Sequence, residues 1–278
     1  EDVVASHQKS QTGEDWPSGM KIVNDHLARS IREQGMLQEP NSFGYIHLAG
    51  EVESVHPLKR TSANKRALLS QLIAASEKLL SAYPSEIRRA DVFQAFVVPP
   101  GSAEGKSVLK KQNYSVHVAE FDVVVLIECT SVDAAKQVRD RPDFRELEKM
   151  LVDSASYTHC IVAKNAKRIA EVDKTKDGIF LFNHFFAADV KAKGSEGIDI
   201  LLAVWEYTAG WWTANANLKN STPIQPVEGE KSEYSLINHC RWDKLWHVLP
   251  HLIFRPSMRQ FVLANFTAND IVAMPVLY

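Results

Sequence analysis

The stretch GIFLFNHFFAAD, at residues 178–189, decides how the rest of the chain is interpreted. It is a short apolar run with an Asn-His pair at 183–184 in its middle. A second run, YSLINHCRWD at 234–243, carries another Asn-His pair at 238–239. Short apolar runs of this kind are consistent with buried strands. The repeated dipeptide therefore predicts a polar spot inside a sheet or barrel.

Before this stretch, the apolar pattern predicts four strands and two long helices. The strands fall at 43–52, 92–99, 122–129 and 157–162, and the helices at 62–83 and 130–151. The run DVVVLIEC at 122–129 is apolar on both faces, which is typical of a strand buried on both sides. The segment 101–114 is polar and rich in lysine, and we predict a loop there. This order, β-α-β-β-α-β, is the ferredoxin-like signature.

The same order restarts after a charged segment that has no apolar period. The second set has strands at 179–186, 222–227, 234–241 and 271–277, and helices at 195–214 and 245–264. Pro223 and Pro226 restrict their strand to an edge or an extended segment, and Pro275 places the last strand at an edge. Pro250 and Pro256 interrupt the last helix.

An internal comparison supports a duplication. A shift of 114 residues (255 − 141) places Arg-Pro-x-x-Arg at 141–145 on the same pattern at 255–259. The repeated order of elements carries most of this interpretation. We therefore divide the chain into an N-terminal helical extension, two ferredoxin-like domains and a linker between them. The predicted bounds are 1–40 for the extension, 41–168 for the first domain, 169–177 for the linker and 178–278 for the second domain.

Composition excludes several classes of function. The chain has 278 residues, of which 45% are apolar and 24% charged, as in an ordinary globular protein. Its net charge of −2 argues against nucleic acid or an acidic membrane as partner. The longest apolar run, at 122–128, is too short to span a bilayer. Three scattered cysteines, no CxxC or HExxH motif and no signal-peptide pattern predict no metal site and a cytoplasmic location.

The chain resembles the dimeric α/β-barrel superfamily, in which ferredoxin-like units pair through their sheets around a cavity. The resemblance covers about 43–278 and rests on the element order and on WEYTAGWW, LKNSTPIQP and YSLINHCRWD in the second half. Members include cofactor-free monooxygenases of aromatic polyketides, polyketide cyclases, muconolactone isomerases, haem enzymes and proteins of no known activity. The resemblance implies an α+β fold of tandem ferredoxin-like units and a possible homodimer.

The histidines of the two Asn-His pairs are the first candidate site. The first and third strands of a ferredoxin-like unit are adjacent, so His184 should lie next to His239. On a shared face they could act as acid–base groups, because imidazole titrates near neutral pH. Asn183 and Asn238 would be their hydrogen-bonding partners in substrate binding. The alternative is that each histidine is a structural core residue.

Four further residues could line a binding cavity. Trp205 and Trp212 are seven residues apart and share one helix face, with Tyr207 beside it. His47 occupies, in the first unit, a place similar to that of His184. Tryptophans at this spacing could wall a cavity for an aromatic substrate. The alternative is aromatic packing of the helix on the sheet.

The leading hypothesis is a small-molecule enzyme of the cofactor-free monooxygenase, cyclase or isomerase type. It would act on a hydrophobic, aromatic or polyketide-like substrate in a barrel cavity, by histidine acid–base chemistry. The second hypothesis is a non-catalytic, ligand-binding or stress-associated barrel. A haem-dependent oxidoreductase is the third, because a single axial histidine leaves no sequence pattern.

Overall fold

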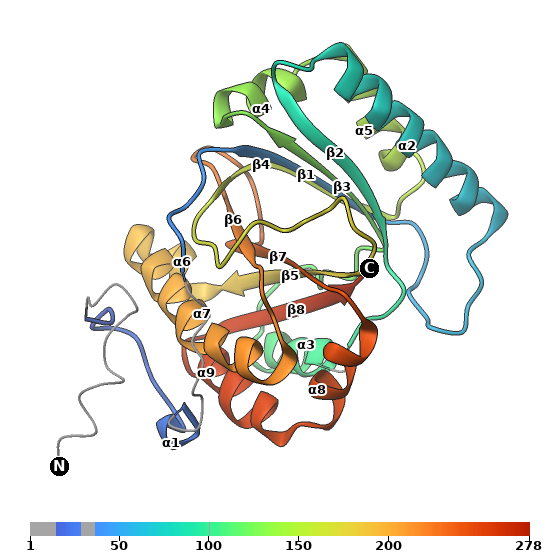
Figure 1. The fold of residues 1–278 in the computed structure, drawn as a ribbon. Helices are drawn as coiled ribbons and strands as arrows, with labels where there is room; N and C mark the ends of the chain where they lie inside the picture. Colours follow the sequence, from blue (N-terminus) through green and yellow to red (C-terminus); the bar gives the residue numbers. More distant parts are fainter. Residues whose placement is uncertain (1–14, 29–36, 100) are drawn as a thin grey trace.

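A computed structural model describes residues 15–28, 37–99 and 101–278 of the chain. All of the named strands belong to one sheet (Figure 1). The strands are β1 (Gly44–Glu51), β2 (Ile87–Gln94), β3 (Val123–Cys129), β4 (Tyr157–Asn165), β5 (Ile179–Ala187), β6 (Thr222–Pro226), β7 (Leu236–Trp242) and β8 (Ile271–Leu277). Their order is β2-β3-β1-β4-β6-β7-β5-β8, and every pairing is antiparallel.

Each half of this sheet has the strand order of a ferredoxin-like unit. The second and fourth strands lie outside and the third and first lie between them, in β2-β3-β1-β4 and again in β6-β7-β5-β8. The halves join where β4 pairs with β6. The sheet curls so that its two ends meet at an isolated bridge, in which Leu277 donates a backbone hydrogen bond to Val97, beyond β2, at 2.8 Å. The prediction of tandem ferredoxin-like units is confirmed.

Helices cover the outer faces of both halves (Figure 1). In the first half, α2, α4 and α5 lie over the sheet, and in the second half α6 to α9 do so. The helical segments are α1 (Asp25–Ala28), α2 (Ala63–Ala82), α3 (Gly101–Lys111), α4 (Val132–Arg139), α5 (Pro142–Val152), α6 (Ala188–Lys193), α7 (Ser195–Ala216), the 3-10 turn η2 (Leu245–His247), α8 (Leu249–Phe254), the π-helical turn η3 (Met258–Leu263) and α9 (Ala264–Ala268).

Three buried clusters follow from this arrangement. One lies between the first half of the sheet and its helices, one inside the barrel, and one between the second half and its helices. All seven residues of β3 are buried, as its two-sided apolar pattern predicts. On β5, Leu181 and Phe185 belong to the helix-side cluster, whereas Phe182 and Phe186 belong to the barrel interior.

Several local predictions are wrong. The predicted loop at 101–114 is helix α3, because the prolines before Gly101 can precede a first helical turn as well as mark a loop. The predicted helix at 130–151 is two helices, since Pro142 occupies the first turn of α5 and cannot continue α4. Strand β2 begins earlier than predicted, at Ile87, and helix α6 was not predicted.

Strand β6 is not an edge of the complete sheet, although it is the outer strand of its own unit. It pairs with β4 on one side and with β7 on the other. Each pairing spans only three residues, which limits the number of ladder bonds that Pro223 and Pro226 interrupt.

The N-terminal extension is mostly not helical where it is described. Of the helical extension predicted at 1–40, the structure shows helix only at α1, and residues 1–14 and 29–36 lie outside the described part. Asn269 exchanges two hydrogen bonds of 2.7 Å with the backbone of Lys21. Asn265 binds the N–H and C=O of Val23 in the same way, at 3.0 and 3.1 Å. These amides hold the backbone extended, because a helix would use the same groups internally.

Candidate functional site: a helix–sheet cavity beside the histidine-rich barrel

The two Asn-His pairs lie side by side, as predicted. Strands β5 and β7 are neighbours, and Asn183 lies opposite Asn238 in their register. Successive side chains of a strand point to opposite faces. The asparagines therefore face the helices, while His184 and His239 face the barrel interior. The two faces offer very different surroundings.

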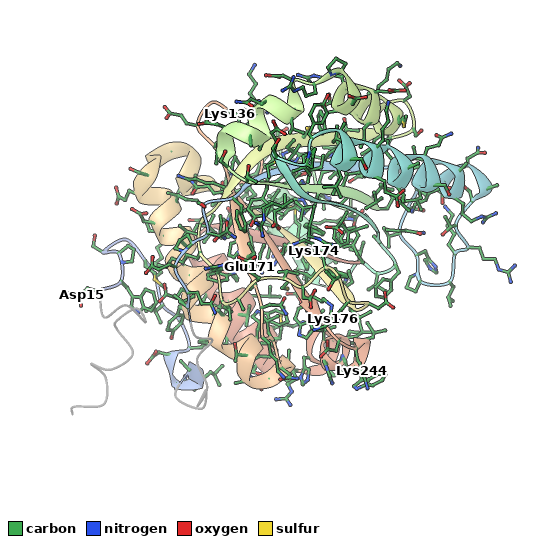
Figure 2. All side chains as sticks on the ribbon, turned by 45° about the horizontal axis from the view of Figure 1, so that its top comes forward. Asp15, Lys136, Glu171, Lys174, Lys176 and Lys244 are labelled. Atoms are coloured by element: carbon green, nitrogen blue, oxygen red, sulfur yellow. The ribbon has the colours of Figure 1, made fainter. Side chains whose placement is uncertain are left out.

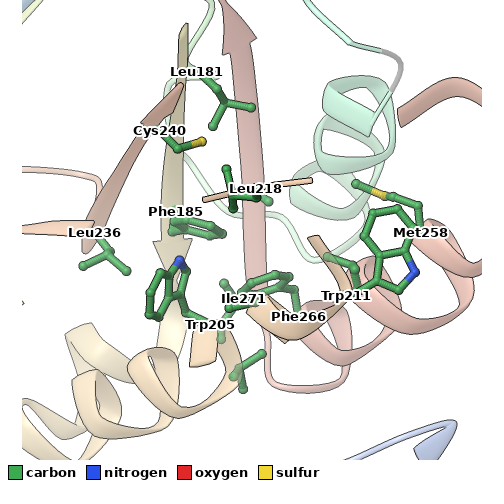
Figure 3. Packing of buried hydrophobic residues seen from close by; sticks show 14 of the residues in the cluster. Leu181, Phe185, Trp205, Trp211, Leu218, Leu236, Cys240, Met258, Phe266 and Ile271 are labelled. Atoms are coloured by element: carbon green, nitrogen blue, oxygen red, sulfur yellow. The ribbon is translucent and has the colours of Figure 1, made fainter. Parts of the chain in front are cut away.

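A cavity lies on the helix side, between strands β5, β7 and β8 and helices α7, α8 and η3. We call it the helix–sheet cavity. Its volume is about 50 Å³, room for a few water molecules, so a larger ligand enters only if the lining side chains move apart. Figure 3 shows strand residue Phe185 close to helix residues Trp205 and Phe266, with Leu181 and Cys240 further along the strands. The described lining consists of Pro99, Leu181, Asn183, Phe185, Trp205, Thr208, Ala209, Trp212, Leu218, Ser221, Asn238, Cys240, Trp242, Leu252, Met258, Arg259, Val262, Leu263, Phe266, Ala273 and Pro275.

Two carboxamides provide polar contacts on the sheet side of this cavity. The Oδ1 of Asn183 is buried and has no hydrogen-bond partner within the described residues. Asn238 differs, because the hydroxyl of buried Ser221 donates to its Oδ1 at 2.7 Å. A buried polar atom without a partner costs about 1–3 kcal/mol. A ligand that hydrogen-bonds to Asn183 recovers part of this cost.

Tryptophans form much of the wall of this cavity. Trp205 and Trp212 both line the cavity from α7. Trp242 lines it from β7 and donates from Nε1 to the Ala216 carbonyl at 2.8 Å, which fixes its ring. Tyr207 is not in the described lining. Its hydroxyl donates to Asp25 at 2.7 Å, so it ties α7 to the N-terminal extension.

The predicted catalytic histidines lie on the other side of the sheet, in the barrel interior, which we call the lumen. His184 is 0% exposed and His239 is 2% exposed. His184 packs against His47, with ring centroids 5.2 Å apart, and against Tyr234 at 5.0 Å. His239 stacks on Phe182, with centroids 4.3 Å apart. Neither histidine lines the helix–sheet cavity.

The lumen histidines are held neutral by burial. Both ring nitrogens of His47, His184 and His239 have no partner within the described residues. Desolvation lowers the pKa of His47 to about 3, with a further contribution from nearby His159. It lowers the pKa of His159 to about 4, and those of His184 and His239 well below the ordinary value. Imidazoles in this state are poorly suited to take up a proton at neutral pH.

Sequence reasoning missed three residues that the fold brings to these places. His159 lies at the edge of the lumen cluster, 6.0 Å from His47 between ring centroids. Its strand, YTHCIV, has the alternation that could have placed it there. Trp242 is the last residue of β7, and Ser221 directly precedes β6. Ser221 reaches Asn238 through the pairing of β6 with β7, which local pattern does not show.

Metal and haem have little support in the described residues. Within the described ranges, no group of three or more histidine, cysteine or acidic side chains is arranged to hold a metal ion. No histidine is among the described residues that line the helix–sheet cavity, so a haem held by an axial histidine does not fit there.

In the described residues, no helix is long and apolar enough to cross a membrane.

Comparison with solved structures identifies the fold. An anthrone oxidase-like protein superposes with a TM-score of 0.58 at 10% identity, over 87% of this chain and 93% of that one. The chain therefore has the two-unit ferredoxin-like, α/β-barrel fold. A monooxygenase-like protein from Lactobacillus acidophilus aligns over 85% of this chain and 93% of its own, at 6% identity and a TM-score of 0.43.

One further match covers half of the chain. A dimeric protein of unknown function with a ferredoxin-like fold, from Bacteroides fragilis, aligns over 99% of its length and 45% of this chain. Its identity is 12% and its TM-score 0.30. No protein-family model matches the sequence. No curated protein matches it either.

Proposed function

We propose that the protein is an enzyme that binds a planar, largely apolar molecule in the helix–sheet cavity and oxidises it with O2. The observation that carries the proposal is the lining itself. Tryptophan and aliphatic walls surround a carboxamide, Asn183, whose buried oxygen has no partner in the described residues. Apolar cavities with a few placed polar groups bury a hydrophobic ligand and fix its orientation.

The two asparagines define the polar part of the ligand. A carboxamide offers an acceptor oxygen and two N–H donors. Asn183 has its oxygen available, while the oxygen of Asn238 already accepts from Ser221. A ligand with a hydroxyl group close to a carbonyl group matches this pair, because its hydroxyl donates to Asn183 and its carbonyl accepts an amide N–H. Hydroxylated polycyclic ketones are compounds of this class.

The proposed reaction converts an activated methylene between aromatic rings into a carbonyl. One atom of O2 forms the new C=O bond, and the second leaves as water with the two hydrogens of the methylene. The substrate supplies all four electrons, so the balance needs no separate reductant. We choose this reaction because the chain shares its fold with the anthrone oxidase-like protein. Fold alone leaves the chemistry open, so the assay decides it.

The test uses 1-hydroxyanthrone as the probe, because it carries a hydroxyl beside its carbonyl and an activated methylene between its aromatic rings. Tryptophan fluorescence reports binding, because three tryptophans line the cavity, and an oxygen electrode with product analysis reports turnover. Ala209→Phe fills the cavity from α7 and should weaken binding by at least about tenfold. Ala214→Phe makes the same change at an exposed position of the same helix and should leave binding unchanged. Equal binding by both variants would show that the ligand does not bind in this cavity.

The second candidate is a non-catalytic ligand-binding protein, which the side chains of the described lining favour. The described lining contains no histidine or acidic side chain, and burial raises the pKa of the Cys240 thiol. Arg259 is paired with Glu104 at 2.9 Å. If 1-hydroxyanthrone binds tightly, yet oxygen is not consumed faster than in buffer, the binding role is correct and the oxidase role is not.

The lumen histidines remain a separate prediction. A direct acid–base role for His184 or His239 requires the ligand to enter the lumen. If the helix–sheet cavity is the site, His184→Phe and His239→Phe should change kcat/KM by less than about threefold, provided that the variants fold. A loss of kcat/KM of about a hundredfold or more in folded variants would show that the reaction takes place in the lumen.

A further inference from the structure

The segment η2–α8 is apolar on two opposite sides. Its inner side is buried, with Val248 at 0% and Leu252 at 6% exposure, and Leu252 lines the helix–sheet cavity. Its outer side carries Trp246 and Phe254, which are 64% and 77% exposed. A helix of an ordinary globular protein has a polar outer face. The proposed function does not use this outer side.

The exposed apolar residues form one stripe. Pro250, Ile253 and Phe254 have the spacing i, i+3 and i+4 in α8, which places them on one helical face, and Trp246 precedes them in the 3-10 turn η2. All four are exposed. Large aromatic side chains in such a stripe mark an interaction surface more often than single exposed hydrophobic residues do. We call these four residues the outer stripe.

The charge around the outer stripe is positive, in contrast to the net charge of −2 for the whole chain. The sequence from 244 to 269 contains no aspartate or glutamate. Lys244 and Arg255 flank the stripe and are exposed, and Figure 2 shows Lys244 at the periphery of the molecule. The Nζ of Lys244 lies 4.9 Å from the centre of the Trp246 ring.

Two acidic groups, one next to Lys244 in the chain and one in contact with η3, are already engaged in ion pairs. Asp243 pairs with Arg241 at 2.9 Å, and Glu104 pairs with Arg259 at 2.9 Å. Arg255 donates to the side-chain oxygen of Asn215 at 2.6 Å and keeps its positive charge. Among the described residues, no ion pair joins Lys244 or Arg255 to an acidic group, so the surface around the stripe combines exposed aromatic rings with positive charge.

We propose that the outer stripe docks on the surface of an anionic lipid bilayer. Tryptophan and phenylalanine with flanking lysine and arginine are the side chains that bind this interface, the rings entering the acyl boundary and the cations meeting the lipid phosphates. The segment is held by its buried inner side, so docking needs no unfolding. Docking also brings the wall of the helix–sheet cavity close to the bilayer, where apolar compounds partition. The docking itself does not depend on the proposed function.

The test is co-sedimentation of the full chain with vesicles of phosphatidylcholine alone and with about 30 mol% phosphatidylglycerol. We expect binding to the anionic vesicles to exceed binding to the neutral ones by at least about fivefold, and to weaken at about 0.5 M salt. The double variant Trp246→Ser/Phe254→Ser should lose at least about tenfold in binding. Lys244→Gln/Arg255→Gln should remove the preference for anionic lipid.

The matched control is Leu58→Ser/Val152→Ser, which removes two exposed apolar residues outside the segment. It should bind vesicles like the unchanged protein. Absence of vesicle binding, or equal binding by the stripe variant and the control, overturns the proposal. So does a concentration-dependent dimer that the stripe variant dissociates in the absence of vesicle binding, because the occupant is then a second copy of the chain. Thermal unfolding of all variants checks that each is folded.

Discussion

Asn183 and His184 are adjacent in the chain and meet opposite surroundings, because a strand alternates its side chains between two faces. The alternation and the pairing of β5 with β7 could be predicted from sequence. The face that holds the cavity could not be predicted from the sequence, since it depends on how α7, α8 and η3 pack on the sheet. The asparagines consequently line a cavity, whereas the histidines that look more reactive are buried among aromatic rings.

The two asparagines should respond oppositely to the same substitution. Asn183→Leu removes a buried oxygen that has no partner in the described residues, so stability should hold or rise by up to about 1 kcal/mol while ligand affinity falls. Asn238→Leu leaves the buried Ser221 hydroxyl without its acceptor and should cost about 1–3 kcal/mol. Urea unfolding measures both, and equal destabilisation would contradict the assignment.

The lumen histidines predict an acid-sensitive fold. Their folded-state pKa values lie below that of an unfolded histidine, about 6.5, so the unfolded state binds more protons. Their contribution to stability is complete above about pH 6.5 and is lost as pH falls toward about 4 and 3. Urea midpoints at about pH 7.5, 6 and 5 should show the decline. His47→Phe should reduce its slope, and the same change at exposed His56 should not.

At the scale of elements, local pattern predicts long strands and helices well. It fails where a proline is compatible with both a loop and the start of a helix. The run at 122–129 could only be a buried strand, and β3 is one. A Pro-Pro-Gly segment marks a loop or precedes a helix, and here α3 follows it. The hydrogen bonds of Asn265 and Asn269 with the backbone of residues 21–23 are long-range contacts, which no local sequence pattern contains.

The start of α2 is attached to the sheet by a buried ion pair. Lys65 lies 2.6 Å from Asp122, which also accepts from the backbone N–H groups of Val52 and Glu53 at 2.6 and 2.8 Å. Asp122→Asn leaves the Lys65 charge buried without its partner, so we expect a loss of about 3–5 kcal/mol in unfolding free energy. Asp153→Asn breaks an exposed pair and should change it by less than about 1 kcal/mol. Similar losses in both variants would contradict this account.

At the scale of the whole molecule, the two predicted domains share one interior. The lumen cluster takes Tyr45 and Phe121 from the first half and Phe182 and Tyr234 from the second. Repetition of elements in the sequence predicts two units. It does not show that their sheets continue into each other through β4 and β6. The domain bounds drawn from the sequence therefore remain a prediction. They describe a duplication, and they do not imply that either half folds independently.

A shared interior predicts a single cooperative unfolding transition. Separating the halves exposes the lumen cluster, so neither half should retain its structure after the other has unfolded. Calorimetry of the full chain should give one transition whose calorimetric and van't Hoff enthalpies agree. Two resolved transitions would show that the halves are stable separately.

The most direct measurement is a crystal structure of the protein with a hydroxylated polycyclic ketone. The account predicts a planar ligand between α7 and strands β5 and β7, with its hydroxyl within about 3 Å of the Asn183 carboxamide. Ligand density in the lumen beside His184, with an unchanged helix–sheet cavity, would contradict it.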